Sequence, residues 1–220
     1  MFHVEQTLFV DILIDGTSTF GIKLDAGQVS ALTSYYRELD RWNQKINLTA
    51  THDTREIAIK HFLDSLLFGQ ALDQRTDASL LDVGSGAGFP GLPLKVLVPG
   101  LRVTLLEPNE KKTSFLRHII GTLDLKEVAV VSKSLRDYCR EPTQQGQFSY
   151  VTTRAVSAEQ VLPLSSTLLE KRGRAILCLA NALEYDTGQY GLKVSHEFRY
   201  ELPHGYGRRV LTVLESSASS

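Results

Sequence analysis

A glycine-rich loop with an acidic residue just before it is the part of this sequence best suited to bind a cofactor. The segment LDVGSGAGFPG at residues 81–91 contains Gly84, Gly86 and Gly88, and Asp82 lies two residues ahead of the first glycine. Glycines let the backbone approach a ligand closely, and a loop that leads from a buried strand into a helix presents free amide groups to it. We therefore predict a cofactor-binding loop.

The loop fits two kinds of cofactor. Gly86, Gly88 and Gly91 match the dinucleotide fingerprint. Either cofactor needs a carboxylate at the end of the next strand for its ribose hydroxyls, and Glu107 lies about twenty residues further on. Asp82 favours S-adenosylmethionine, because a carboxylate there attracts the cationic methionine end of this molecule and would repel a pyrophosphate. We expect S-adenosylmethionine with the product S-adenosylhomocysteine; a nicotinamide-dependent oxidoreductase is the alternative.

The pattern around the loop predicts an α/β fold with a mainly parallel sheet. Helical periodicity, clearest from Lys111 to Leu123, alternates with short β-rich runs, which favours parallel strands joined by right-handed crossovers. Turn residues between two later β-rich runs predict a C-terminal antiparallel hairpin. The predicted strands cover residues 80–83, 102–107, 127–131, 148–153 and 174–180, and those of the hairpin 193–200 and 209–215.

The first third of the chain is predicted to be helical. Asp25 with Gln28, and Asp53 with Glu56, have the spacing of capping boxes ahead of amphipathic periodicity. We expect a helical N-terminal region at 1–75 and a methyl-donor-binding domain at 76–220.

Composition limits the possible partners. The 24 Lys plus Arg residues and 25 Asp plus Glu residues give a net charge of -1, so any binding of a polyanion requires a local basic patch. Cys139 and Cys178 lie far apart without His or Cys at ligand spacing, so we expect no metal and no disulfide. The apolar run from Leu8 to Ile14 is too short to span a bilayer, which favours a soluble protein without membrane contact.

Several motifs in order resemble the ribosomal small-subunit methyltransferase G family, also called glucose-inhibited division protein B. This resemblance implies a Rossmann-like class I methyltransferase domain behind the helical region. It further implies a cytoplasmic enzyme, which we expect to be a monomer, that forms 7-methylguanosine near the decoding centre of small-subunit (16S) ribosomal RNA, free or in a ribosomal particle. The motifs are WNQKINLTA at 42–50, HFLDSL at 61–66, LDVGSGAGFPGLPL at 81–94, LLEPNEKKTSFL at 105–116 and TTRAVS at 152–157.

The resemblance also implies a set of cofactor contacts. Glu107 would hold the ribose, Ser134 and Leu135 would flank the adenine, and Asp82 with the loop amides would position the methionine portion. The chain departs from the family where Glu107 replaces a frequent Asp, and at 179–181, where Leu-Ala-Asn replaces an LKG-like motif. The full set of contacts carried over is Gly84, Phe89, Glu107, Pro108, Asn109, Ser134, Leu135 and Arg154.

The expected chemistry needs no general base, because N7 of guanine carries a free lone pair that attacks the sulfonium methyl directly. Catalysis then depends on in-line positioning and fixed dipoles. Arg154 is the first candidate for this role, with a structural salt bridge as its alternative. Asn47 would bind the base or merely end its helix. His61 and Asp64 share a helix face, where they would either line the substrate cleft or hydrogen-bond to each other and fix the domain contact; we favour the structural role.

A local basic patch would supply the RNA contacts that the net charge does not, with a merely solvated helix face as the alternative. Two further functions stay open: a small-molecule methyltransferase, which needs an enclosed pocket, and a non-catalytic ribosome-assembly factor. The residues of the patch are Lys111, Lys112, Arg117, Lys133 and Arg136.

Overall fold

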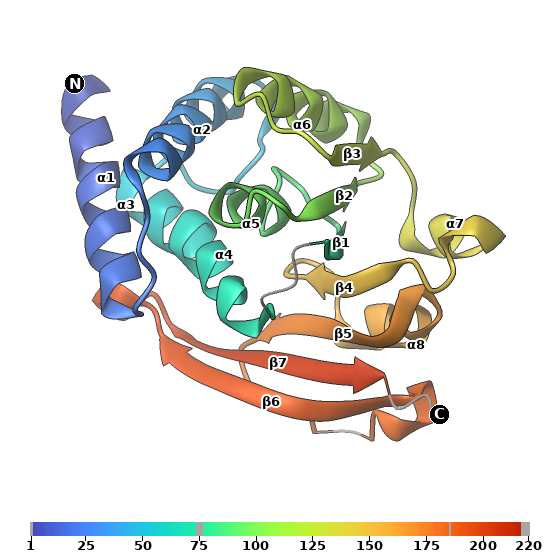
Figure 1. Cartoon of the computed structure of the whole chain (residues 1–220). Helices are drawn as coiled ribbons and strands as arrows, with labels where there is room; N and C mark the ends of the chain where they lie inside the picture. Colours follow the sequence, from blue (N-terminus) through green and yellow to red (C-terminus); the bar gives the residue numbers. More distant parts are fainter. Residues whose placement is uncertain (1, 74–76, 185, 217–220) are drawn as a thin grey trace.

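A mixed sheet forms the centre of the molecule in the computed structural model, which describes residues 2–73, 77–184 and 186–216 (Figure 1). Within these residues the sheet has seven strands in the order β3-β2-β1-β4-β5-β7-β6. The first five strands of this order are parallel and the last two form an antiparallel hairpin on the β5 edge, as predicted. The strands are β1 (Ser79–Val83), β2 (Arg102–Leu106), β3 (Val128–Val131), β4 (Phe148–Thr153), β5 (Leu169–Leu179), β6 (Leu192–Glu201) and β7 (Arg208–Ser216).

Helices cover both faces of this sheet (Figure 1). The N-terminal helices lie with α5 and α6 on one face, where Phe9, Tyr35 and Phe62 share a hydrophobic cluster with Leu80 of β1 and Leu105 of β2. The α7 and α8 helices pack on the other face in a second cluster. The helices are α1 (Phe2–Thr19), α2 (Ala26–Ile46), α3 (Thr54–Ile57), α4 (Asp64–Leu67), α5 (Gly91–Leu97), α6 (Glu110–Thr122), α7 (Leu135–Cys139) and α8 (Ala158–Leu168).

Shorter helical turns connect these elements. The π-helical segment η1 (Ala58–Leu63) joins α3 to α4, and the 3-10 turns are η2 (Phe68–Ala71), η3 (Pro142–Gln144), η4 (Gly188–Tyr190) and η5 (Pro203–Gly205). The predicted boundary between residues 75 and 76 lies outside the described residues. Because the cluster on the N-terminal side is continuous with the sheet, the helical region and the sheet share one core. Within the described part of the chain, no helix is long and apolar enough to cross a membrane.

The helix starts follow the predicted capping residues. Gln28 N donates to Asp25 Oδ1 at 2.8 Å and Gln28 Oε1 accepts from Asp25 N at 2.9 Å, which confirms that capping box. Asp53 caps α3 by accepting from Glu56 N at 2.7 Å, but Asp53 N donates to Thr51 Oγ1 at 3.2 Å instead of to Glu56, so the second predicted capping box is only half formed. The sequence pattern predicted one helix after Asp53, whereas the structure has α3, the π-helical segment and α4 in succession.

The strand order reverses between β1 and β4, since β1 pairs with β2 on one side and with β4 on the other. In open α/β sheets the crevice outside the carboxyl ends of the strands at such a switch point is the usual place for a ligand. The glycine loop leaves β1 at this point and leads into α5.

Candidate cofactor and substrate site

The glycine loop has a backbone that requires glycine. Gly84, Gly86 and Gly88 have φ values of 70°, 59° and 99°, a region that side chains with a Cβ rarely adopt. A Cβ on Gly88 would also collide with the Tyr35 hydroxyl and with Leu92. The loop is therefore folded tightly against α2 and α5.

Glu107 ties the glycine loop to the turn after β2. Its Oε2 accepts from Gly86 N at 2.9 Å and its Oε1 accepts from Asn109 N at 2.9 Å, while the residue is 6% exposed. Asn109 in turn caps α6 by accepting from Lys111 N at 3.0 Å and from Lys112 N at 3.2 Å. The carboxylate thus fixes the relative position of both segments at the carboxyl edge of the sheet.

Asp82 lies underneath the loop and is fully buried. Its Oδ2 accepts from Gly91 N, the first residue of α5, at 2.9 Å, and its Oδ1 has no hydrogen-bond partner among the described residues. Burial raises the pKa of this carboxyl to about 7, and the hydrogen bond from Gly91 opposes the shift. Asp82 therefore contacts the loop and the start of α5 from below.

A cavity of about 480 Å³ opens at the carboxyl ends of β1 and β2, a size within the range of small-molecule sites. Gly84, Pro108, Ser134 and Leu135, all expected to contact the cofactor, line it together. Lys133 and Arg136, expected to contact RNA, line the same cavity; Lys133 also pairs with Glu141. The remaining lining residues are Val83, Leu106, Val156, Glu159, Gln160, Pro163 and Leu164.

Sequence reasoning missed the part of this lining that comes from α8 and from the segment between β4 and α8. Val156, Glu159 and Gln160 have no residue type or spacing that marks a ligand site. Only the strand order, which brings β4 next to β1, places them beside the glycine loop.

Other predicted residues lie outside the cavity lining. Phe89 stacks on Tyr35, with centroids 5.4 Å apart, and on His61 at 5.2 Å, so it packs toward the N-terminal helices. Asn47 is exposed and ends α2 in the left-handed conformation with φ 45°. Lys111 and Arg117 are exposed on α6.

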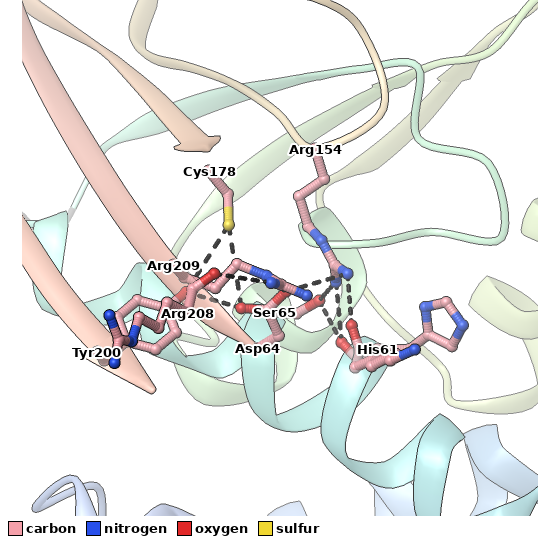
Figure 2. Close-up of polar contacts among 9 residues, drawn as sticks. His61, Asp64, Ser65, Arg154, Cys178, Tyr200, Arg208 and Arg209 are labelled. Carbon is pink, nitrogen blue, oxygen red and sulfur yellow. Dashed lines mark hydrogen bonds and ion pairs between the residues drawn. The ribbon is translucent and has the colours of Figure 1, made fainter. Parts of the chain in front are cut away.

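Arg154 follows β4 directly and turns toward the N-terminal helices rather than into the cavity (Figure 2). Its Nη1 donates to Ser65 Oγ at 2.8 Å and to the His61 carbonyl at 3.2 Å, and its Nη2 donates to the Lys60 carbonyl. The Nη2 atom also lies 3.2 Å from Asp64 Oδ2 in an ion pair. A π-helix shifts backbone hydrogen bonds out of their usual register, and the arginine binds two carbonyls of that segment.

Asp64 is the centre of this polar cluster. The residue is 1% exposed, accepts from the Tyr200 hydroxyl at 2.7 Å, and has Arg209 Nε 3.7 Å from its Oδ2 (Figure 2). Burial and the nearby Asp64 charge raise the pKa of Cys178 to about 11, so this thiol is protonated at neutral pH. The favoured structural role of Asp64 agrees with these contacts.

His61 does not share the hydrogen bonds of Asp64, although both lie on one helical stretch. Burial and the nearby Arg154 charge lower the pKa of the His61 imidazole to about 4, so it is neutral at physiological pH. Among the described residues, no group of His, Cys, Asp and Glu is arranged to hold a metal ion.

Comparisons with known proteins give the family. The family model described as rRNA small subunit methyltransferase G matches residues 28–203. The ribosomal RNA small subunit methyltransferase G of Roseiflexus castenholzii is 42% identical over 175 residues, which cover 76% of this chain and 74% of that protein. The protein of the same name from Dehalococcoides mccartyi is 37% identical over 220 residues, 94% of this chain and 92% of its own.

Solved structures share the fold at much lower identity. TrmN from Thermus thermophilus superimposes with a TM-score of 0.55 at 19% identity, covering 70% of this chain and 48% of its own. TYW2 from M. jannaschii, in a complex with AdoMet, gives 0.52 at 17% identity, covering 67% of this chain and 71% of its own. The family model and the curated relatives together show that this chain, a Rossmann-like methyltransferase, belongs to the rRNA small subunit methyltransferase G family.

Proposed function

We propose that this chain transfers the methyl group of S-adenosylmethionine to N7 of a specific guanine in small-subunit ribosomal RNA near the decoding centre, and releases S-adenosylhomocysteine. The observation that carries the proposal is the cavity at the carboxyl edge of the sheet. Gly84, Pro108, Ser134 and Leu135, which follow three different strands, line this cavity together. Their proximity supports the proposal that they contact the cofactor. Family membership supplies the class of acceptor.

The cavity lining, together with Glu107 and Asp82 next to it in the sequence, fits this cofactor. Pro108 and Leu135 offer apolar surface for the adenine, and Ser134 lies beside them. Each oxygen of Glu107 accepts one backbone hydrogen bond and keeps a lone pair that a ribose hydroxyl can use. The backbone of the loop, shaped from below by Asp82, would position the methionine portion. The bound cofactor supplies an electrophilic methyl group on a sulfonium.

The protein's part in the chemistry is positioning and electrostatics. Guanine N7 has a free lone pair, so no side chain has to remove a proton before attack. In our proposal Arg154 holds the 58–65 segment against the sheet edge and thereby positions the groups that bind the target guanine. Asn47, exposed at the end of α2, would contact the target base.

RNA contacts are proposed for α6, whose first turn lies at the same edge of the sheet as the cavity. Lys111, Lys112 and Arg117 are the residues concerned, and Lys111 and Arg117 are exposed. Lys133 and Arg136, which line the cavity, would contact RNA there. A cytoplasmic monomer stays the expected organisation, with a helical region at 1–75 and a cofactor-binding region at 76–220 that share one core.

A competition experiment tests the class of acceptor. Values of kcat/KM for methyl transfer are compared for unmethylated small ribosomal subunits, protein-free small-subunit RNA, and GTP or guanosine. The proposal predicts that kcat/KM for the two RNA-containing substrates is far above kcat/KM for GTP or guanosine. Preference for a free nucleoside would support the small-molecule alternative, and intact cofactor binding without any transfer would support an assembly role.

A further inference from the structure

A second groove lies where β5 stops and the β6–β7 hairpin continues. The last pair between β5 and β7 is Leu179 with Val210, so residues 208 and 209 extend beyond the end of β5. The chain from Ala180 to Ala182 turns away there and leaves a groove of about 540 Å³ between itself and the hairpin. This groove includes the segment in which the chain departs from the family's LKG-like motif.

The groove is basic. Arg199, Arg208 and Arg209 line it together with a single acidic residue, Glu201. In an antiparallel pair, directly opposite residues point to the same face, so the Tyr200–Arg209 pair and the Glu201–Arg208 pair point to opposite faces. Arg209 points to the face of the N-terminal helices, where it meets Asp64 (Figure 2). Arg199 and Arg208 point the other way.

The two outward arginines are accessible to a ligand. The side chain of Arg199 is 68% exposed, and that of Arg208 is 85% exposed. Arg199 Nη2 lies 2.9 Å from Glu197 Oε2, and Arg208 Nε lies 3.9 Å from Glu201 Oε2. Exposed pairs of this kind are weak, and a phosphate can replace the carboxylate at little cost because a guanidinium binds both in the same forked geometry.

The groove lies at the same edge of the sheet as the cofactor cavity, because β5 is parallel to β1 and β4 and ends at that edge. The cluster of Asp64, Arg154 and Arg209 connects the groove to the end of β4, because Arg209 lines the groove, Arg154 follows β4, and both pair with Asp64. This cluster has two guanidiniums against one carboxylate. A polyanion that reaches the reacting centre from the hairpin side therefore meets positive charge along its path.

We infer that this groove binds the phosphodiester backbone of the substrate RNA, with the guanidiniums of Arg199 and Arg208 as the phosphate contacts. The inference rests on the proposed function for its acceptor and adds a surface opposite to the α6 patch. Small side chains at Ala180 and Ala182 leave room for the backbone of the RNA, and Asn181 is exposed between them.

The test compares two double variants that remove the same charge. R199A/R208A changes the groove; R102A/K126A removes two exposed cations at the opposite, amino edge of the sheet. Binding of a protein-free small-subunit RNA fragment, and of intact small subunits, is measured by filter retention over a range of KCl concentrations. S-adenosylmethionine binding is measured by calorimetry. The groove variant should bind the RNA about tenfold more weakly, with a salt slope reduced by about 1.4–1.8 for two lost phosphate contacts. Its cofactor affinity should match that of the wild type.

Three results would overturn the inference: unchanged RNA affinity and salt slope in R199A/R208A, an equal loss in R102A/K126A, or a loss seen only with protein-containing particles, which would indicate an acidic protein partner. Failure of the proposed function would look different. If the wild type bound RNA through the groove but transferred no methyl group, the proposed function would fail and the groove assignment would stand. If methyl transfer were intact and R199A/R208A bound RNA normally, only the groove assignment would fail.

Discussion

Arg154, at the end of β4, forms an ion pair with Asp64 of α4, with Nη2 and Oδ2 3.2 Å apart. The contact joins the N-terminal helices to the carboxyl edge of the sheet, at residues 90 positions apart in the sequence. It also brings the HFLDSL and TTRAVS motifs together, because the aspartate of the first pairs with the arginine of the second.

Replacing Asp64 by Asn should reduce the free energy of unfolding by about 3 kcal/mol, because two guanidiniums then lose their buried counter-charge. Urea unfolding followed by circular dichroism measures the loss. D124N is the matched control, since Asp124 is an exposed partner of Lys126 with a positive φ that Asn tolerates; its change should stay within about 0.5 kcal/mol. Equal stability of D64N and D124N would show that the cluster contributes nothing to folding.

Arg154→Lys should lower kcat about a hundredfold, because the lysine keeps the charge but cannot bind Ser65, Asp64 and the carbonyls of the 58–63 segment together. Steady-state kinetics with small subunits separates kcat from KM. R174K is the control, a partly exposed arginine paired with Glu215 at the amino edge, and should keep its kcat. A normal kcat in R154K would refute the positioning role of Arg154.

Gly88→Ala should reduce stability by about 2 kcal/mol or more and weaken cofactor binding, since its φ of 99° is strained for alanine and a Cβ would meet the Tyr35 hydroxyl. Thermal unfolding and calorimetry report the two effects. Gly121→Ala, in α6 with nothing near its added Cβ, should instead stabilise the protein by about 0.5–1 kcal/mol. Equal thermal stability of the Gly88→Ala and Gly121→Ala variants would show that close packing does not require a glycine at position 88.

Asp82 should make stability depend on pH. Burial raises its pKa from 3.8 to about 7 in the folded protein, so the folded state holds this proton more tightly than the unfolded state. The stability that the proton provides is complete below about pH 4 and is lost as the pH rises toward 7. The unfolding free energy of D82N minus that of the wild type should therefore increase by about 1.4 kcal/mol per pH unit from pH 5 to 7, because only the wild type loses stability over this range. Above pH 7 the difference should level off. A difference that is constant with pH would contradict the assignment.

Helical periodicity, short β-rich runs and capping residues were enough to predict a mainly parallel sheet with flanking helices, because these signals are local. The α1 helix was not singled out, since it begins at residue 2 without a predicted cap. The strand β5 starts at Leu169 rather than at 174 because Leu169 pairs with Phe148 across an irregularity, which no local pattern reveals.

The site was predictable only in part. Gly84, Pro108, Ser134 and Leu135 line one cavity, since each follows a strand of one parallel sheet, and their contact with the cofactor stays a prediction. The orientation of individual side chains depends on tertiary packing. That is why Asp82 lies under the loop and Phe89 against Tyr35, and why Arg199 and Arg208, on a hairpin distant in sequence, were not selected.

The most direct test of the account identifies the methylated nucleoside. Small subunits from a strain that lacks the endogenous methylation are incubated with the enzyme and radiolabelled S-adenosylmethionine, and their RNA is digested to nucleosides and separated. The account predicts label in 7-methylguanosine at a stoichiometry approaching one per subunit, and none when the subunits already carry the modification. Label in any other nucleoside, or no label while the cofactor still binds, would contradict it.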